Sequence, residues 1–229
     1  MRELFQIPIF PVFVTLAAFR ASVALQKKLK SPLCNPILVA VIIILVFQFA
    51  TGMDLKAYQA GNSYISWLLT PATVSLAVPM YEQFQILRKN TGVLLAGIAA
   101  GAISCLGMVL AFCLLLGFAP ELTVSLLPKS VTTAIGVPLS EIAGGIAPIT
   151  TAAIVLTGIA ASVLGPALCK LFRLTDDIAQ GAAYGTAGHV VGTSKAMEHS
   201  ELAGAASSFS LVIAGLLTAI VLPLVAACL

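Results

Sequence analysis

The sequence predicts an all-α polytopic membrane protein with about seven to eight transmembrane segments, some of them broken or re-entrant. Of the 229 residues, 59% are hydrophobic and 9% are charged, whereas a soluble domain has roughly a quarter charged residues. The mean hydropathy is +1.06, and apolar runs long enough to cross a bilayer recur along the whole chain. These observations exclude a soluble enzyme, a nucleic-acid-binding protein and a disordered regulator.

No cofactor or metal ion is expected. The five cysteines show no C-x-x-C or metal-type spacing, so they are interpreted as small apolar side chains. Two histidines are too few for an all-protein transition-metal site. The sequence also lacks a nucleophile elbow, a phosphate-binding loop and a zinc-protease motif, so we do not expect an enzyme.

The apolar segments follow one another without a soluble insertion, which predicts a single membrane domain over residues 1–229. The first segment is interpreted as a retained span rather than a cleaved signal, because Arg20 interrupts it and lysines follow at once. Residues 51–63 are a polar stretch that carries Asp54 and Lys56. The segments expected to cross or enter the membrane are 5–25, 36–50, 64–87, 91–118, 120–148, 149–171, 175–200 and 202–229.

Basic residues at the ends of these segments predict the orientation, since cytoplasmic loops are enriched in Lys and Arg. They cluster at 27–30, 88–89 and 170–173. All three clusters lie on the cytoplasmic side if the N-terminus is outside and the Pro-rich segment 120–148 is re-entrant. We therefore expect a multi-pass protein of the bacterial inner membrane with that orientation.

The order of segments predicts an inverted repeat. Units 36–118 and 149–229 each contain a span, an interrupted span and a long span, and the segment 120–148 joins them. Such repeats are a recurring plan of secondary transporters. A shift of 116 residues places Thr70 on Thr186, Val74 on Val190 and Glu82 on Glu198, and the layout carries more weight than these few identities.

Three stretches, 70–79, 127–138 and 185–195, combine Pro or Gly with hydroxyl side chains and lie near a carboxylate. A broken helix at membrane depth persists only where protein or water receives its free backbone groups, and a half-helix N-terminus suits a carboxylate ligand. Proton coupling is assigned to Glu82, Glu141 or His189. The predicted substrate-binding residues are Thr70, Pro71, Ala72, Thr73, Lys129, Ser130, Thr132, Thr133, Gly188, His189, Gly192, Thr193 and Ser194.

Each feature also has a purely structural interpretation, which the sequence leaves open. Pro71 can simply kink a span, and Ser or Thr can bond the carbonyl four residues back. Gly188 and Gly192 have the spacing of closely packed helices. Lys129 can extend its ammonium to the membrane interface, and His189 can bond a backbone carbonyl.

The chain resembles the LrgB/CidB family of bacterial membrane proteins. The motifs that carry the resemblance are NPILVAVIII at 35–44, YISWLLTPATVSLAVPMYEQ at 64–83, SLLPKSVTTAIGVPLSEIAGGI at 125–146 and GTAGHVVGTSKAME at 185–198. They extend over nearly the whole chain, and the lysine-containing motif is the most specific. The last motif departs from the family pattern, since Ala187-Gly188-His189 stands where Ser-Ser-His or a similar run is expected.

The resemblance implies two different functional classes. Family members are described as antiholin-like regulators of murein hydrolase activity and cell lysis, acting with a small LrgA/CidA-type membrane protein. A plastid relative is a glycolate/glycerate transporter, and bacterial relatives have been linked to pyruvate uptake. The broken helices favour a carrier of small monocarboxylates, working as a homo-oligomer such as a dimer, and the antiholin-like regulator is the alternative.

Overall fold

The computed structural model describes residues 9–29 and 36–229, and the chain divides into two compact units between Ser75 and Leu76. The first residues of the predicted 5–25 span, and Lys30 of the first basic cluster, lie outside the described residues. Every regular element in the described part is a helix, so the predicted all-α class is confirmed.

Three helices are long and apolar enough to cross a membrane, judged by length and composition. They are α7 (Thr91–Leu115), α10 (Ala147–Leu171) and α12 (Glu201–Ala226), and α2 (Pro36–Thr51) is a shorter apolar helix. The other predicted segments are helices that are more polar or are interrupted, as described below. The chain is therefore a helical membrane protein.

The first unit contains α1 (Phe10–Leu29), α2, α3 (Leu55–Trp67) and α4 (Leu69–Ser75), with α1 packed on α2 and α3. Most of the polar stretch 51–63 belongs to the helix α3. Asp54 caps this helix by accepting a bond from the amide of Lys56. Thr15 of α1 contacts the Tyr58 hydroxyl at 2.6 Å and donates to Asn62. Polar side chains of this stretch thus have hydrogen-bond partners on another helix.

The predicted interruption of segment 64–87 is confirmed. After α3 the chain forms three short helices, α4, α5 (Ala77–Glu82) and α6 (Phe84–Lys89). Pro71 and Pro79 are each the third residue of a short helix. Because proline has no N–H and clashes with the preceding turn, the helix breaks shortly before each proline, at Leu68 and Leu76.

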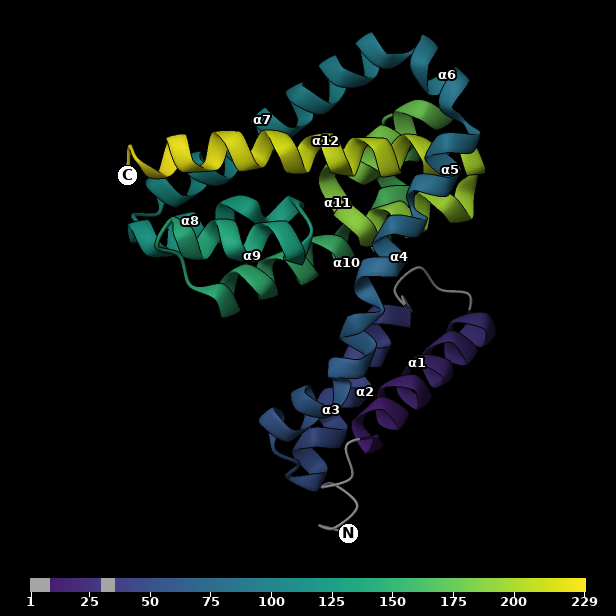
Figure 1. The fold of residues 1–229 in the computed structure, drawn as a ribbon, viewed down its shortest axis with the longest axis vertical. Helices are drawn as coiled ribbons and strands as arrows, with labels where there is room; N and C mark the ends of the chain where they lie inside the picture. The colour runs from purple at the N-terminus through teal and green to yellow at the C-terminus, as the bar shows by residue number, and fades with distance from the viewer. Residues whose placement is uncertain (1–8, 30–35) are drawn as a thin grey trace. The chain divides into compact units, whose positions relative to one another are not determined.

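The second unit is built on the three long helices (Figure 1). The first halves of α7 and α12 share a core that contains Ile98 and Ala206, and their second halves share another that contains Leu106 and Leu222. These two helices are therefore parallel. The end of α10 packs near the start of α12, where Cys169 and Ala203 belong to one cluster, so α10 runs the opposite way.

Residues 120–142 form a first helical hairpin, here called hairpin 1. It consists of α8 (Pro120–Leu126), the 3-10 turn η2 (Leu127–Ser130) and α9 (Thr133–Ile142). Its base is tied by the Ser125 hydroxyl, which accepts a bond of 2.7 Å from the amide of Ile146. At about 1.5 Å per residue, neither helix is long enough for a hydrocarbon core of about 30 Å.

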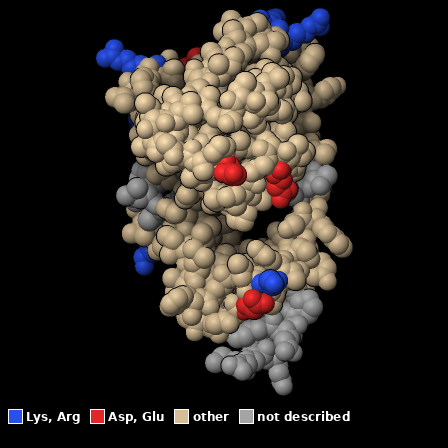
Figure 2. Space-filling model, turned by 90° about the vertical axis from the view of Figure 1, so that its left-hand side faces the viewer, with Lys and Arg blue, Asp and Glu red and all other residues tan. Residues whose placement is uncertain are grey.

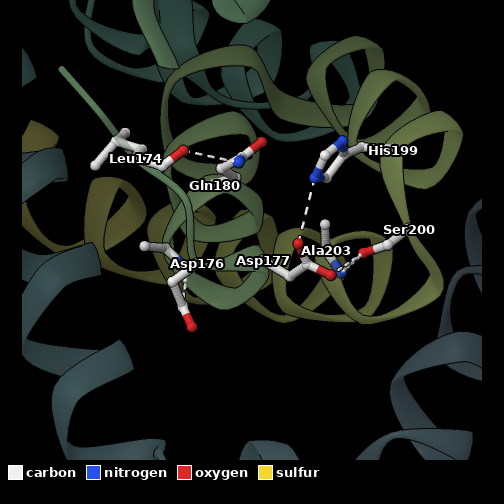
Figure 3. A network of polar contacts seen from close by, with 8 residues as sticks. Leu174, Asp176, Asp177, Gln180, His199, Ser200 and Ala203 are labelled. Carbon is white, nitrogen blue, oxygen red and sulfur yellow. Dashed lines mark hydrogen bonds and ion pairs between the residues drawn. The ribbon is translucent and has the colours of Figure 1, made fainter. Parts of the chain in front are cut away.

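Residues 177–199 form a second hairpin, hairpin 2, although the sequence suggested an interrupted span. The helix α11 (Asp177–His199) doubles back at His189, whose φ is 43° and ψ is −139°. Its two ends meet, because the Asp177 carboxylate contacts His199 at 3.2 Å and accepts a 2.6 Å bond from Ser200 (Figure 3). In a straight helix these ends would be about 33 Å apart.

The second unit has one basic end. Arg88 and Lys89 precede α7, while Lys170 and Arg173 lie at the end of α10. Because α7 and α10 run in opposite directions, all four basic residues lie at the same end, the end from which hairpin 2 enters. Figure 2, which is turned by 90° from the view of Figure 1, shows a mostly uncharged surface with a few scattered charged groups.

Candidate functional site

The tips of the two hairpins approach each other at the middle of the second unit. The imidazole Nε2 of His189, at the tip of hairpin 2, lies 2.9 Å from the carbonyl oxygen of Ile154 in α10. The Cδ1 atom of Ile154 lies 2.8 Å from the position that a Cβ would take on Gly136 in hairpin 1. The two hairpins enter the second unit from opposite ends. Both contact α10 at Ile154.

Lys129 lies at the tip of hairpin 1 and is half-buried. Its ammonium donates to the Cys105 sulfur of α7 and to the Ser130 hydroxyl, both at 3.3 Å. The sulfur and that hydroxyl are themselves 3.1 Å apart. Within the described part of the chain Lys129 forms no ion pair. A positive charge inside a membrane bundle with only neutral partners is suited to a bound anion.

The backbone beside Lys129 is also suited to an anion. Pro128 has non-helical dihedral angles, and the chain is extended at Val131 and at Thr132, which precedes the first turn of α9. The Thr132 side chain makes no capping bond to that turn. The amides at a helix N-terminus carry a partial positive charge. Thr132 is half-buried and Thr133 is exposed, so the predicted residues of this stretch do lie together at one helix break.

His189 is buried, and it bonds a backbone carbonyl as the structural interpretation proposed. Its positive φ is unfavourable for a residue with a Cβ. The ring fits against α10 because residue 158 is glycine, where a Cβ would lie 2.6 Å from the Cε1 atom of His189. The imidazole therefore helps to fix the tip of hairpin 2, and its role in proton coupling stays a prediction.

The other predicted residues of hairpin 2 have packing roles in the structure. The Thr193 hydroxyl donates to the carbonyl of His189 and contacts the Ser207 hydroxyl, both at 2.9 Å. Ser194 bonds the carbonyl four residues back. Gly188 packs on Ala161, and Gly192 packs on the carbonyl of a residue in the other limb of the hairpin. These contacts stabilise the tip of hairpin 2. Substrate binding by these residues stays a prediction.

The remaining predicted residues lie away from the tips of the hairpins, or their side chains are not among those that the structure describes. Thr70, Pro71, Ala72 and Thr73 belong to α4 of the first unit; Pro71 and Ala72 are exposed, and the side chains of the two threonines are not among those described. Glu82 and Glu141 are exposed near the ends of α5 and α9. Glu198 forms a 2.6 Å ion pair with Lys195.

A groove of about 530 Å³ runs between α7 and the first limb of hairpin 2. Its mouth contains Asn90 and Asp176, at the basic end, and its lining extends along both helices to Cys105 and Thr186. The sequence interpretation missed these last two residues, because a cysteine in an apolar run looks like a small hydrophobic side chain. The spacing of four between Gly97, Gly101 and Cys105 was the available signal for a small-residue face.

Gly158→Ala tests whether the His189 ring packs against residue 158 of α10. We expect the variant to lose about 1–3 kcal/mol of stability, because the new methyl group overlaps the imidazole. Gly107→Ala on α7 is the control, since a Cβ there meets nothing within 4 Å and alanine favours a helix. Thermal unfolding in detergent measures both variants. A Gly158→Ala protein as stable as Gly107→Ala would show that His189 does not pack there.

No solved structure matches this chain. The model of the LrgB-like family matches residues 15–228 of the 229 residues. That match spans both hairpins, the three long helices and most of the first unit. The expected resemblance is thereby confirmed, and the chain belongs to the LrgB-like family of membrane proteins.

Proposed function

We propose that this protein is a multi-pass carrier of the bacterial inner membrane for small monocarboxylates such as glycolate, glycerate or pyruvate. The observation that carries the proposal is the Lys129 ammonium, which is held at a helix break by two neutral partners, Cys105 and Ser130. A substrate carboxylate would supply the opposite charge. The hydroxyls of Ser130 and Thr132 and the free amides of α9 are the further donors available beside it.

The two hairpins support a carrier with alternating access. They enter from opposite ends of the second unit and their tips meet α10 at Ile154. Small movements of one hairpin at a time would open the central site to one side of the membrane and then to the other. By the distribution of basic residues, the end where hairpin 2 enters is cytoplasmic, and the N-terminus is outside.

Proton coupling is assigned to His189, with Glu141 and Glu82 as the other candidates. His189 lies at the tip of hairpin 2, and its ring bonds the backbone of α10 rather than another side chain. A change in its protonation would change that bond and with it the position of the tip of hairpin 2. The proposed activity is transport without a catalytic step.

Uptake of labelled glycolate or pyruvate into proteoliposomes tests the carrier. We expect uptake above that of protein-free vesicles when a proton or sodium gradient is imposed. Absence of uptake under every gradient, with murein hydrolase activity in cells still dependent on the gene, would instead support an antiholin-like regulator that acts with an LrgA/CidA-type partner. Uptake by the purified protein alone would show that transport needs no such partner.

A further inference from the structure

The groove between α7 and hairpin 2 is much larger than a two- or three-carbon acid requires. Its volume of about 530 Å³ falls in the range of pockets that hold drug-sized ligands. Resting on the proposed carrier function, we propose that this groove binds the aliphatic chain of longer monocarboxylates, with the carboxylate directed towards Lys129. The carrier would then accept acids of about four to eight carbons, in addition to the short ones.

The walls of the groove are suited to a hydrocarbon chain. On α7 they are formed by Val93, Leu94, Gly97 and Gly101, and on hairpin 2 the facing residues are mostly alanines, such as Ala183. None of these side chains carries a polar group. A methylene chain in this groove would leave water at about 0.8 kcal/mol per CH₂, whereas a short hydroxy acid would gain nothing from such walls.

The end of the groove lining opposite Asp176 lies next to a residue that contacts the lysine. Gly101 and Thr186 come together there, since a Cβ on the glycine would lie 3.1 Å from the Thr186 methyl group. Cys105 also lines this end, and its sulfur accepts the bond from the Lys129 ammonium. Cys105 is therefore shared by the groove and by the contact shell of the Lys129 ammonium.

The mouth of the groove carries one acidic residue among the basic residues of this end. Asp176 lies there, and its carboxylate is fixed because it accepts a 2.8 Å bond from the amide of Ala179. A ligand carboxylate at the mouth would be repelled by this negative charge. The direction of binding therefore rests on the other end of the lining, where Cys105 contacts the Lys129 ammonium, and the chain of an acid with its carboxylate there would lie along the apolar walls.

A chain-length series tests the proposal. Acetate, butanoate, hexanoate and octanoate are used as inhibitors of labelled pyruvate uptake, and their binding to the purified protein is measured by calorimetry. For wild type, we expect affinity to rise about threefold to fourfold for each added methylene until the groove is full. Hexylamine has the same chain with a positive head group, and we expect it to bind far more weakly than hexanoate.

Two glycine variants on the same helix form the matched pair. In Gly97→Leu the new side chain fills the groove, and in Gly107→Leu it projects from another face of α7; a Cβ at either position meets nothing within 4 Å. We expect the ratio of hexanoate to acetate affinity to fall close to one in Gly97→Leu. In Gly107→Leu the ratio should equal that of wild type. Thermal unfolding confirms that both variants are folded.

The outcomes separate this inference from the proposed function. Suppose that pyruvate is taken up but that inhibition does not depend on chain length, or depends on it equally in both variants. This result would contradict binding of the aliphatic chain in the groove and would still support the proposed carrier. Equal binding of hexylamine and hexanoate would also contradict the inference, because the groove would then be a site for any acyl chain, including that of a lipid. Chain-length-dependent binding of hexanoate by a protein that takes up neither pyruvate nor glycolate would support the groove and contradict the carrier.

Discussion

Lys129→Met is expected to lower the uptake of labelled pyruvate or glycolate at least about 30-fold. Methionine keeps much of the length of the side chain and removes its charge. Removing one partner of a buried charged pair costs about 2–5 kcal/mol, and about 1.4 kcal/mol corresponds to a factor of ten. The variant should fold normally, because replacing a buried charge by an apolar group of similar size is often neutral or stabilising.

Lys195→Met is the matched control for this experiment. Lys195 also lies on a hairpin, but its ammonium already has a carboxylate partner in Glu198 at 2.6 Å. We expect its uptake to stay within about twofold of wild type, since an exposed pair of this kind contributes little. Equal uptake by both variants and wild type would contradict a role of Lys129 in substrate binding. It would favour the interpretation in which the ammonium extends to the membrane interface.

The positions of the helix breaks could be predicted from the sequence, because their causes are local. Proline has no N–H and clashes with the preceding turn, and the breaks lie at or just before Pro71, Pro79 and Pro128. The three long helices followed from composition and length for the same reason. Each of these features depends on residues within one or two turns of one another.

The direction of the chain after a break could not be predicted in the same way. Residues 175–200 were interpreted as an interrupted span, yet they fold back on themselves at His189. The contacts that close the hairpin join Asp177 to His199 and Ser200, more than twenty residues apart. A second non-local contact, between Lys129 and Cys105, likewise made a sulfur part of the site although the sequence around it is mostly apolar.

The two hairpins also indicate an internal sequence repeat. Its shift is 60 residues, whereas the shift of the predicted repeat is 116 residues. Ser140-Glu141-Ile142-Ala143-Gly144 follows the tip of hairpin 1, and Ser200-Glu201-Leu202-Ala203-Gly204 follows hairpin 2 sixty residues later. Four of these five residues are identical. The same shift places Lys129 on His189, so each hairpin carries an ionisable residue at its tip. The repeat of 36–118 and 149–229 stays a prediction beside this shorter one.

Gly192→Ala is expected to destabilise the protein by several kcal/mol, and the sign of this effect distinguishes a hairpin from a straight helix. In a straight helix, replacing an interior glycine by alanine stabilises by about 0.5–1 kcal/mol. In hairpin 2 a Cβ at residue 192 would instead collide with the carbonyl oxygen of Tyr184 in the opposite limb. A backbone oxygen cannot move aside as a flexible side chain can, so the two limbs would have to separate.

Gly97→Ala serves as the control, since glycine 97 lies in a regular part of α7 where a Cβ meets nothing within 4 Å. Thermal unfolding in detergent should place the melting temperature of Gly192→Ala well below that of wild type, and that of Gly97→Ala at or above it. A rise for both variants would indicate that residues 177–199 form a continuous helix. The chain would then cross the membrane once more, and α12 would run in the opposite direction relative to the basic end. Because hairpin 2 forms one wall of the groove and places His189 against α10, the same measurement tests the architecture on which the proposed carrier depends.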